Sequence, residues 1–371
     1  MTIHNENLDL AIGLRHRLHA HPELSGQEKW TRNHLMDFLR ANTKLEVVDR
    51  GKWFYAVYRA EKDKRSIAFR ADFDAISLHE TTDLPWKSKF NGVAHKCGHD
   101  GHCAAMVAFA LEVDQRGADK NIFFLFQHAE ETGEGAKECQ VFISENGISE
   151  IYAFHNMPGF EKGVVYVREG TTSCASSGIN CCFTGHPSHA SEPEKGINPC
   201  FAISELVLSI DGLINEGSWN DLVMCTVINI QVGEPAFGVS PGEGVARFTC
   251  RAAIETELKL LIMQLEKKSH ELAAKYNLTL NIEYQDAFPE TVAHGQSVEK
   301  IRTVCEDIGI PFVMMASPIR ASEDFGYYTK QIPGAMFIVG AGDVPEIHTH
   351  DYDFDDDLIK IVASIYLKLA S

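Results

Sequence analysis

The order of expected helices and strands changes near residues 178 and 287, and this constrains the fold more than any other feature of the sequence. Before the first change, the apolar spacing over residues 8–40 predicts two helices separated by a turn at residues 21–23. Strands then alternate with a helix, as in an α/β sheet whose ligands usually lie beyond the carboxyl ends of the strands. The expected strands are 54–58, 66–70, 122–126 and 151–154, and the expected helix is 101–114.

Between the two changes, the sequence predicts a strand, a helix, two strands, a helix and a strand, which is the split βαβ or ferredoxin-like arrangement. After the second change the first pattern resumes, and a closing helix is expected from Asp356. We therefore expect an α/β protein in which residues 178–286 form a small domain, inserted into a larger domain made of residues 1–177 and 287–371. The strands expected in the small domain are 179–185, 223–232, 244–254 and 278–284; the last part of the chain is expected to hold a helix at 298–308 and a strand at 335–339.

The charge of the chain argues against nucleic acid and membranes as partners. Its 34 Lys and Arg against 52 Asp and Glu give a formal net charge of -18, which repels polyanions. No segment approaches the roughly 20 apolar residues of a membrane span, and the N-terminal residues lack the layout of a signal peptide. We therefore expect a cytoplasmic protein. Its ten cysteines are expected to be mostly buried thiols.

The segment HKCGHDGH at residues 95–102 carries the sharpest chemical signal. In an extended segment Cys97 and His99 point the same way, and a thiolate with an imidazole suits zinc and similar transition metals. The alternative is a polar loop that caps a helix, with Asp100 as the N-cap and solvated histidines.

Glu130 and Glu131 follow a strongly apolar strand. Neighbouring carboxylates in an extended segment face opposite ways, so one can bind a metal while the other acts on substrate or water. An ordinary acidic loop is the alternative. His155 and His348 also stand where strands are expected to end, although a lone histidine there is more often structural. Because strand ends in one sheet converge, the segments together offer more ligands than one tetrahedral ion needs and about enough for two: Cys97, His99, Glu131, His155 and His348.

Eight segments, taken in order, resemble the dinuclear metallopeptidase family of amidohydrolases, the group of aminoacylases, hippurate hydrolases and auxin-conjugate hydrolases. The resemblance implies a mixed-sheet, zinc-peptidase-like catalytic domain with two divalent metal ions (Zn, Mn, Co or Ni) per subunit. It also implies that the inserted ferredoxin-like domain is a lid that often mediates dimerisation, so that a homodimer is expected. The segments are RHRLHAHPELSGQE (15–28), RADFDAISLHE (70–80), HKCGHDGHCAA (95–105), HAEETGEGAKE (128–138), HNMPG (155–159), GHPSHASEP (185–193), SEDF (322–325) and HTHDYDFDDD (348–357).

The same resemblance implies roles for individual residues. Glu130 would be the general base. Asp72 and Asp74 match an element where similar proteins keep acids near the metals, so Asp74 is a candidate catalytic residue beside Glu130 and His189. For both aspartates, a hydrogen-bonding role at a strand end is the alternative to direct catalysis. The metal ligands implied by the motifs are Cys97, His99, Glu131, His155 and His348.

The lid motifs imply contacts with the substrate. His189 resembles a histidine that reaches a partner subunit's active site and steadies the oxyanion; an ordinary loop histidine is the alternative. Arg251 resembles an arginine that holds the substrate carboxylate; an ordinary exposed arginine on a strand is the alternative. Two positions depart from the family pattern: Gly238 stands where asparagine is common, and His128 stands where proline is common.

The implied reaction is cleavage of the amide bond of N-acyl amino acids, or of short peptides with a free C-terminal carboxylate, by metal-activated water. A hydrolase with Cys97 as nucleophile is one alternative. A non-catalytic module that binds metal or peptide is another. The presence of both Glu130 and Glu131 argues against such a module, because a binder needs only the ligand.

Overall fold

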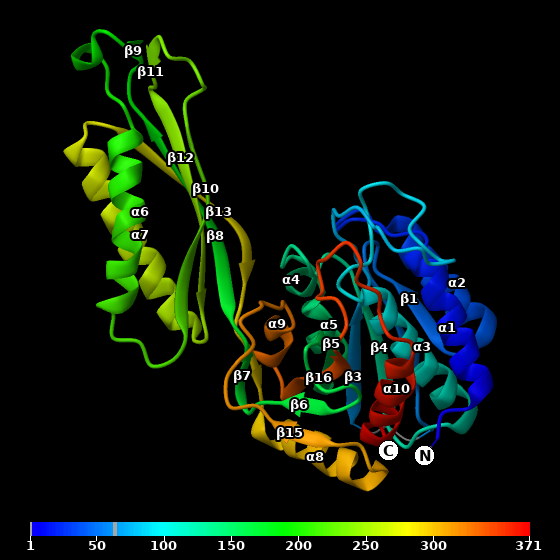
Figure 1. Cartoon of the computed structure of the whole chain (residues 1–371). Coiled ribbons are helices and arrows are strands. Elements are labelled where there is room, and N and C mark those ends of the chain that lie inside the picture. Colours follow the sequence, from blue (N-terminus) through cyan, green and yellow to red (C-terminus); the bar gives the residue numbers. More distant parts are fainter. Residues whose placement is uncertain (1, 62–64) are drawn as a thin grey trace. The chain divides into compact units, whose positions relative to one another are not determined.

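A computed structural model describes residues 2–61 and 65–371 of the chain. The chain divides into two compact units, which are described separately here (Figure 1). The first unit comprises Met1–Thr172, Thr291–Pro318 and Glu323–Ser371; the second comprises Ser173–Glu290 and Ile319–Ser322. The short segment Ile319–Ser322 belongs to the second unit although the sequence predicted only one continuous insertion.

The first unit is built on an eight-stranded mixed sheet in the order β1-β2-β4-β3-β5-β16-β6-β15. Its centre is parallel: β3 pairs with β4 and β5, and β5 pairs with β16. The antiparallel pairs lie nearer the edges, between β1 and β2, β2 and β4, and β16 and β6. The strands are β1 Glu46–Asp49, β2 Phe54–Tyr58, β3 Ser66–Asp72, β4 Asn121–Gln127, β5 Ile148–Pro158, β6 Val165–Val167, β15 Phe312–Met314 and β16 Gly334–Gly342.

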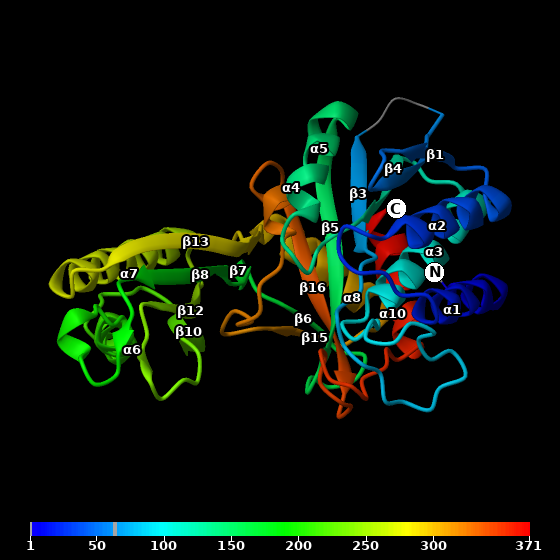
Figure 2. The same ribbon diagram turned by 90° about the horizontal axis from the view of Figure 1, so that it is seen from above.

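Helices cover both faces of this sheet (Figure 2). Alternate residues of a strand point to opposite faces, so Phe124 and Phe126 join one apolar cluster while Phe123 and Leu125 join another. The first cluster packs against α1 Asn5–His19, α2 Lys29–Asn42, α3 His99–Arg116, α8 Gly295–Ile308 and α10 Asp357–Leu369. The second packs against α4 Gly135–Cys139, α5 Val141–Asn146 and α9 Gly326–Thr329. Burial on both faces explains why β4 is apolar without interruption over residues 122–126.

The second unit is a four-stranded antiparallel sheet in the order β10-β12-β8-β13, with two helices on one face. On β12, Ala246, Phe248 and Cys250 alternate with partly exposed residues and are buried under the helices. The edge strand β10 exposes Ile228 and Ile230. The elements are β8 Ala175–Thr184, α6 Cys200–Asn215, β10 Val223–Val232, β12 Glu243–Ala252, α7 Glu255–Lys275 and β13 Thr279–Phe288.

Short elements complete the two units. A two-stranded ladder joins β9 to β11, and another joins β7 to β14. The ten cysteines are all free and seven of them are buried, which confirms the expectation of buried thiols. Among the helices of the described residues, none combines the length and apolar character that crossing a membrane requires. The short elements are β7 Gly170–Ser173, β9 Ser188–His189, the 3-10 helix Pro193–Lys195, β11 Val239–Ser240 and β14 Thr291–Ala293.

Candidate metal centre and active site

The Cys97–His99 segment is a sharp turn into α3. The expectation of an extended segment is wrong here, because Gly98 has a φ of 105° and His99 is already the first residue of the helix. A side chain at Gly98 would meet the amide of Asn156 at 2.4 Å, so glycine is needed both for the backbone angle and for the space. The alternative of a solvated cap is also wrong, since His99 and Asp100 are fully buried and Gly98 is the N-cap.

Glu130 and Glu131 lie in a turn just beyond β4, so the expected extended segment is wrong for them as well. Ala129 before them has a φ of 48°, a region that residues other than glycine seldom adopt. Its N–H donates to Glu28 Oε1 at 2.8 Å, and the N–H of Glu131 donates to Asp74 Oδ2 at 3.0 Å. Both acceptors lie far from the turn in the sequence, so the turn is held by other segments of the chain. These hydrogen bonds leave the Glu130 side chain almost wholly buried and that of Glu131 partly exposed.

The two remaining histidines occupy different kinds of position. His155 lies within β5, three residues before its end, and not beyond the strand as the sequence suggested. His348 lies in a loop after β16 with a φ of 61°. Burial, followed by the charge of His102, lowers the pKa of His155 to about 3, which keeps it in the neutral form that binds metals.

These segments bring their polar side chains together within the first unit. Cys97 Sγ lies 3.4 Å from His155 Nε2, and His348 Nε2 lies 3.4 Å from Glu131 Oε1. His99 Nε2 lies 3.8 Å from Glu131 Oε1 and 3.9 Å from Glu130 Oε2. Among the described residues, five overlapping groups can each hold an ion. Three of them combine residues predicted from the sequence as ligands or as the base: Cys97, His99 and His155; Cys97, Glu131 and His348; and His99, Glu130 and Glu131.

The cluster fits divalent metal ions. His99 Nε2 and Glu131 Oε1 are buried and lack a hydrogen-bond partner in the described part of the chain. Such orphaned atoms are costly unless a ligand satisfies them. Sulfur, nitrogen and oxygen donors together suit zinc and its neighbours in the transition series, and several of the donors belong to more than one group, as they would around a pair of ions.

Asp74 orients His99. The Nδ1 atom of His99 lies 3.0 Å from the Asp74 carbonyl oxygen and 3.1 Å from its Oδ1. Both are acceptors, so Nδ1 carries the proton and Nε2 keeps its lone pair for an ion. Ser25 Oγ donates to Asp74 Oδ2 at 2.7 Å and steadies the carboxylate.

Asp72 borders the cluster, because its Oδ2 lies 3.7 Å from His99 Nε2. Its Oδ1 is 2.5 Å from His102 Nδ1, and its Oδ2 accepts from Arg70 Nη1 at 2.7 Å. Burial acts to raise the pKa of Asp72, but Arg70, His99 and His102 outweigh it and hold that pKa well below its usual range. Asp72 is therefore held in its ionised form, and hydrogen bonds with Arg70 and His102 fix its carboxylate.

Glu130 stands among other carboxylates. Burial, then the charges of Glu323, Glu131 and Asp324, raise the pKa of Glu130 well above its usual range. Arg70 offsets part of this charge, because its Nη2 donates to Glu323 Oε1 at 3.0 Å and to Asp324 Oδ1 at 2.8 Å. A site with surplus negative charge attracts cations, whether protons or metal ions.

Several residues of this centre were not singled out from the sequence alone. Glu28 and Asp324 hold the turn after β4; Asp324 Oδ2 accepts from the N–H of Ala136 at 2.8 Å and from Gln127 Nε2 at 2.8 Å. Both residues lie in segments that carry the family resemblance, so the signal was present. Nothing in the spacing showed that they contact the segment around the turn after β4.

His189 and Arg251 belong to the second unit. His189 is exposed on β9, and its Nδ1 accepts from the N–H of Ser191 at 3.2 Å. Arg251 on β12 donates from Nη1 to Ser322 Oγ at 2.7 Å and to the carbonyl oxygen of Arg320 at 3.3 Å. The carbonyl oxygen of Gly238 accepts from the N–H of Ala190 at 3.0 Å, so Gly238 supports the strand that carries His189.

The amino-acid sequence of the chain is similar to those of known proteins. The model of peptidase family M20/M25/M40 matches residues 68–371. The chain belongs to this family. An N-acetylcysteine deacetylase of Bacillus subtilis is 27% identical over 366 residues, covering 97% of this chain and 95% of the relative. An N-acetyldiaminopimelate deacetylase of Lacticaseibacillus casei is 27% identical over 366 residues, covering 95% and 94%.

A solved structure extends the agreement to the fold. A dinuclear metal binding peptidase of the M20 family from Bacillus subtilis superposes with a TM-score of 0.83 at 25% identity, covering 99% of this chain and 98% of that chain. The expected family of dinuclear metallopeptidases and amidohydrolases is therefore confirmed, and with it a metal-dependent hydrolase on a mixed α/β fold.

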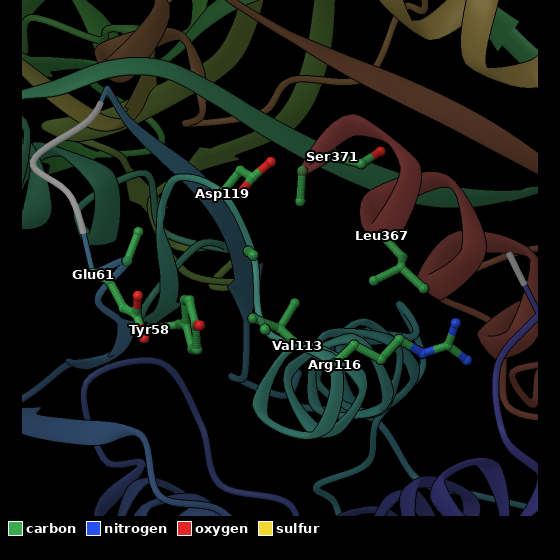
Figure 3. A pocket seen from close by; sticks show the side chains of 11 residues that line it. Tyr58, Glu61, Val113, Arg116, Asp119, Leu367 and Ser371 are labelled. Carbon is green, nitrogen blue, oxygen red and sulfur yellow. The ribbon is translucent and has the colours of Figure 1, made fainter.

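The first unit also contains a cavity of about 630 Å³ that shares no residue with the metal cluster (Figure 3). Tyr58, Val113 and Leu367 line it, and Arg116 stands at its edge. The Arg116 guanidinium is already paired, since Nε donates to Glu112 Oε2 and Nη2 to the carbonyl oxygen of Thr2. Size alone does not make this cavity the reaction site, because its lining residues in the described part of the chain form no convergent set of catalytic or metal-binding groups.

Proposed function

We propose that the protein is a metal-dependent amidohydrolase that cleaves the amide bond of N-acyl amino acids, or of short peptides with a free C-terminal carboxylate. The observation that carries this proposal is the buried cluster of metal-binding groups with Glu130 beside it. The deacetylases among the relatives act on N-acetylated amino acids, which supports the substrate class.

The ions would be held by Cys97, His99, Glu131, His155 and His348. Two divalent ions bound at this centre supply Lewis acidity, which acidifies water and polarises a carbonyl group. Zn, Mn, Co and Ni all suit this mixture of donors.

Glu130 would move the protons. Its Oε2 lies within 3.9 Å of His99 Nε2, so its carboxylate borders the same space as the ligand atoms. It accepts a proton from the attacking water and later delivers it to the leaving amine nitrogen, which releases the amino acid.

The second unit would act as a ferredoxin-like lid, with residues 178–286 as its functional extent. Because His189 Nδ1 accepts the N–H of Ser191, Nε2 carries the proton and can donate to the developing oxyanion, in this subunit or a partner. Arg251 would bind the substrate carboxylate, and its contact with Ser322 holds one edge of the guanidinium in place beforehand.

The lid would also join two subunits into a homodimer in the cytoplasm. β10 is an edge strand of its sheet and exposes Ile228 and Ile230, which a partner would cover. We expect Ile230→Lys to convert the dimer to a monomer in analytical ultracentrifugation, while the same change at Val313, an exposed residue of the first unit, leaves the assembly unchanged.

A cysteine nucleophile at Cys97 is less compatible with the structure. Burial, then the charge of Glu131, raise the pKa of the Cys97 thiol, so that without a metal it is not a reactive thiolate. A non-catalytic binding module would have no use for Glu130 in addition to Glu131.

Chelation tests the proposal. Purified protein should hydrolyse a panel of N-acetyl, N-benzoyl and longer N-acyl amino acids, lose that activity on dialysis against a chelator, and regain it with Mn or Zn. Activity that survives metal removal and is abolished by a thiol reagent would instead support the Cys97 nucleophile. Metal binding without hydrolysis of any substrate would support the binding module.

A further inference from the structure

A buried lysine next to the metal cluster is not explained by the chemistry described so far. Lys96 is fully buried, yet it precedes Cys97 directly and is not itself a metal ligand. A buried ammonium group is very costly unless it is paired and hydrogen-bonded. Lys96 Nζ meets this need by donating to Glu80 Oε1 at 2.7 Å and to the carbonyl oxygen of Tyr352 at 2.6 Å.

The backbone of Lys96 contacts the His348 segment at a second point. The N–H of His348 donates to the carbonyl oxygen of Lys96 at 2.7 Å. His348 has a φ of 61°, and a non-glycine residue keeps such a conformation only when its surroundings enforce it. Lys96 thus holds the loop at His348 through its backbone and four residues later, at Tyr352, through its side chain.

Glu80 connects Lys96 to another loop. The ends of that loop meet where Ile76 and Ala94 exchange hydrogen bonds of 3.2 and 3.1 Å. Inside the loop, Glu80 Oε2 accepts from the N–H of Ser88 at 2.8 Å, and Glu80 Oε1 lies 3.1 Å from His19 Nε2. Glu80 is therefore fixed from several sides and gives Lys96 a rigid partner.

We propose that Glu80 and Lys96 are positioning residues that hold His348 in its coordinating orientation beside Cys97 and Glu131. The inference rests on the proposed function, because it takes Cys97 and His348 to be metal ligands. Neither positioning residue reaches the reacting atoms. Their effect is to keep the left-handed turn at His348 closed, so that its Nε2 stays near Glu131 Oε1.

Lys96→Met tests the proposal by removing the ammonium group while keeping an apolar chain of similar length. Cobalt(II) titration of the metal-free wild type should show two binding steps. In the variant we expect one step to weaken at least about tenfold and the other to change less than about twofold, since outer partners of ligands typically contribute 10–100-fold to metal affinity. Lys87→Met, at an exposed lysine in the loop that carries Glu80, is the matched control and should keep both steps.

The double variant Glu80→Gln/Lys96→Met separates positioning from general stability. It removes both buried charges, so we expect its thermal midpoint to recover relative to Lys96→Met, or to allow folding if the single variant does not fold. The weakened cobalt step should not recover, because the bond to the Tyr352 carbonyl oxygen is still missing. Recovery of both cobalt steps in the double variant would overturn the positioning role.

Cys97→Ser and His348→Ala, measured in parallel, distinguish failure of the inference from failure of the proposed function. If neither lowers metal stoichiometry, the ligand set is wrong, and the proposed function and the inference are both overturned. If both lower it while Lys96→Met keeps two unchanged steps, only the inference is overturned.

Discussion

The two units carry their polar residues in contrasting ways. In the first unit, the sheet is covered on both faces, and the cluster around His99 is held by bonds from several separate segments. In the second unit, helices cover one face of the sheet, and His189 lies exposed on a two-residue strand. Groups that must meet within a few ångströms are built into the first unit, whose sheet is buried on both faces. Groups that we assign to substrate contact and assembly lie on the more exposed one.

The comparison predicts different consequences for mutations in the two units. A change at the buried centre should alter either metal content or proton transfer. A change in the second unit should leave metal content intact and alter transition-state or substrate binding.

Glu130→Ala should have the largest effect, lowering turnover by at least about a hundredfold while metal content stays at the wild-type level, because proton transfer is lost but the ligands remain. Steady-state kinetics and elemental analysis of the same sample measure both. Glu134→Ala, an exposed acid in the next turn, is the control. Near-normal turnover in Glu130→Ala would exclude it as the general base.

His189→Ala should lower kcat by about a hundredfold, in the range found when one oxyanion donor is removed, with little change in KM or metal content. The neighbouring His186→Ala should behave like wild type, because the His186 Nδ1 atom is already engaged with the carbonyl oxygen of Pro187. If KM rises while kcat is unchanged, His189 contributes to substrate binding and does not contact the reacting carbonyl group.

Arg251→Ala should lower kcat/KM by about tenfold to a hundredfold, mainly through KM, because a charge-assisted hydrogen bond to the substrate carboxylate is lost. The variant should also lose the preference for a free carboxylate over its methyl ester, which a competition assay measures. Arg247→Ala on the same strand is the control; its guanidinium donates to Asn229. If the preference for the free acid persists in Arg251→Ala, another group binds the carboxylate.

Glu28→Gln should have the smallest effect and should appear as a pH dependence of stability. Burial, then the charge of Asp74, raise the pKa of Glu28 to about 7 from its ordinary value of 4.5. The folded state thus holds this proton more tightly than the unfolded state. The stability that Glu28 contributes is full below pH 4.5 and is lost as the pH rises through about 7.

In Glu28→Gln, the side-chain oxygen of glutamine can still accept from the N–H of Ala129. Glutamine does not ionise, so the variant does not lose stability as the pH rises. In urea unfolding of metal-free protein, we expect Glu28→Gln to be more stable than wild type by about 1–2 kcal/mol at pH 8 and close to it at pH 4.5. Glu6→Gln, an exposed acid on α1, should show no such difference. A Glu28→Gln variant that is less stable at pH 8 would show that the carboxylate is ionised and needed there.

Much of the order of helices and strands was predictable, because apolar residues recur at clear helical or strand spacing in most segments. The strand expected at 54–58 is β2, and the one expected at 223–232 is β10. β6 and β15, each three residues long, were missed, since strands this short carry too little pattern to be recognised. Ile319–Ser322 was not assigned to the second unit, because only the folded chain shows where so short a segment packs.

The metal-binding residue types were predictable from their motifs, but their local conformations were not. Gly98, Ala129 and His348 all have positive φ. Hydrogen bonds with Glu28 and Lys96, far away in the chain, hold Ala129 and His348 in this conformation. Spacing rules assume regular strands or helices, so they gave extended segments where the structure has turns.

The sequence by itself determined which side chains are available, namely a thiol, three imidazoles and a pair of adjacent acids, and in which order the elements that carry them follow one another. Only the tertiary structure decided how these groups face one another. Lys96, Glu28 and Asp74 impose that geometry through hydrogen bonds between segments distant in sequence, and such bonds form only after the chain has packed, so no local pattern encodes them.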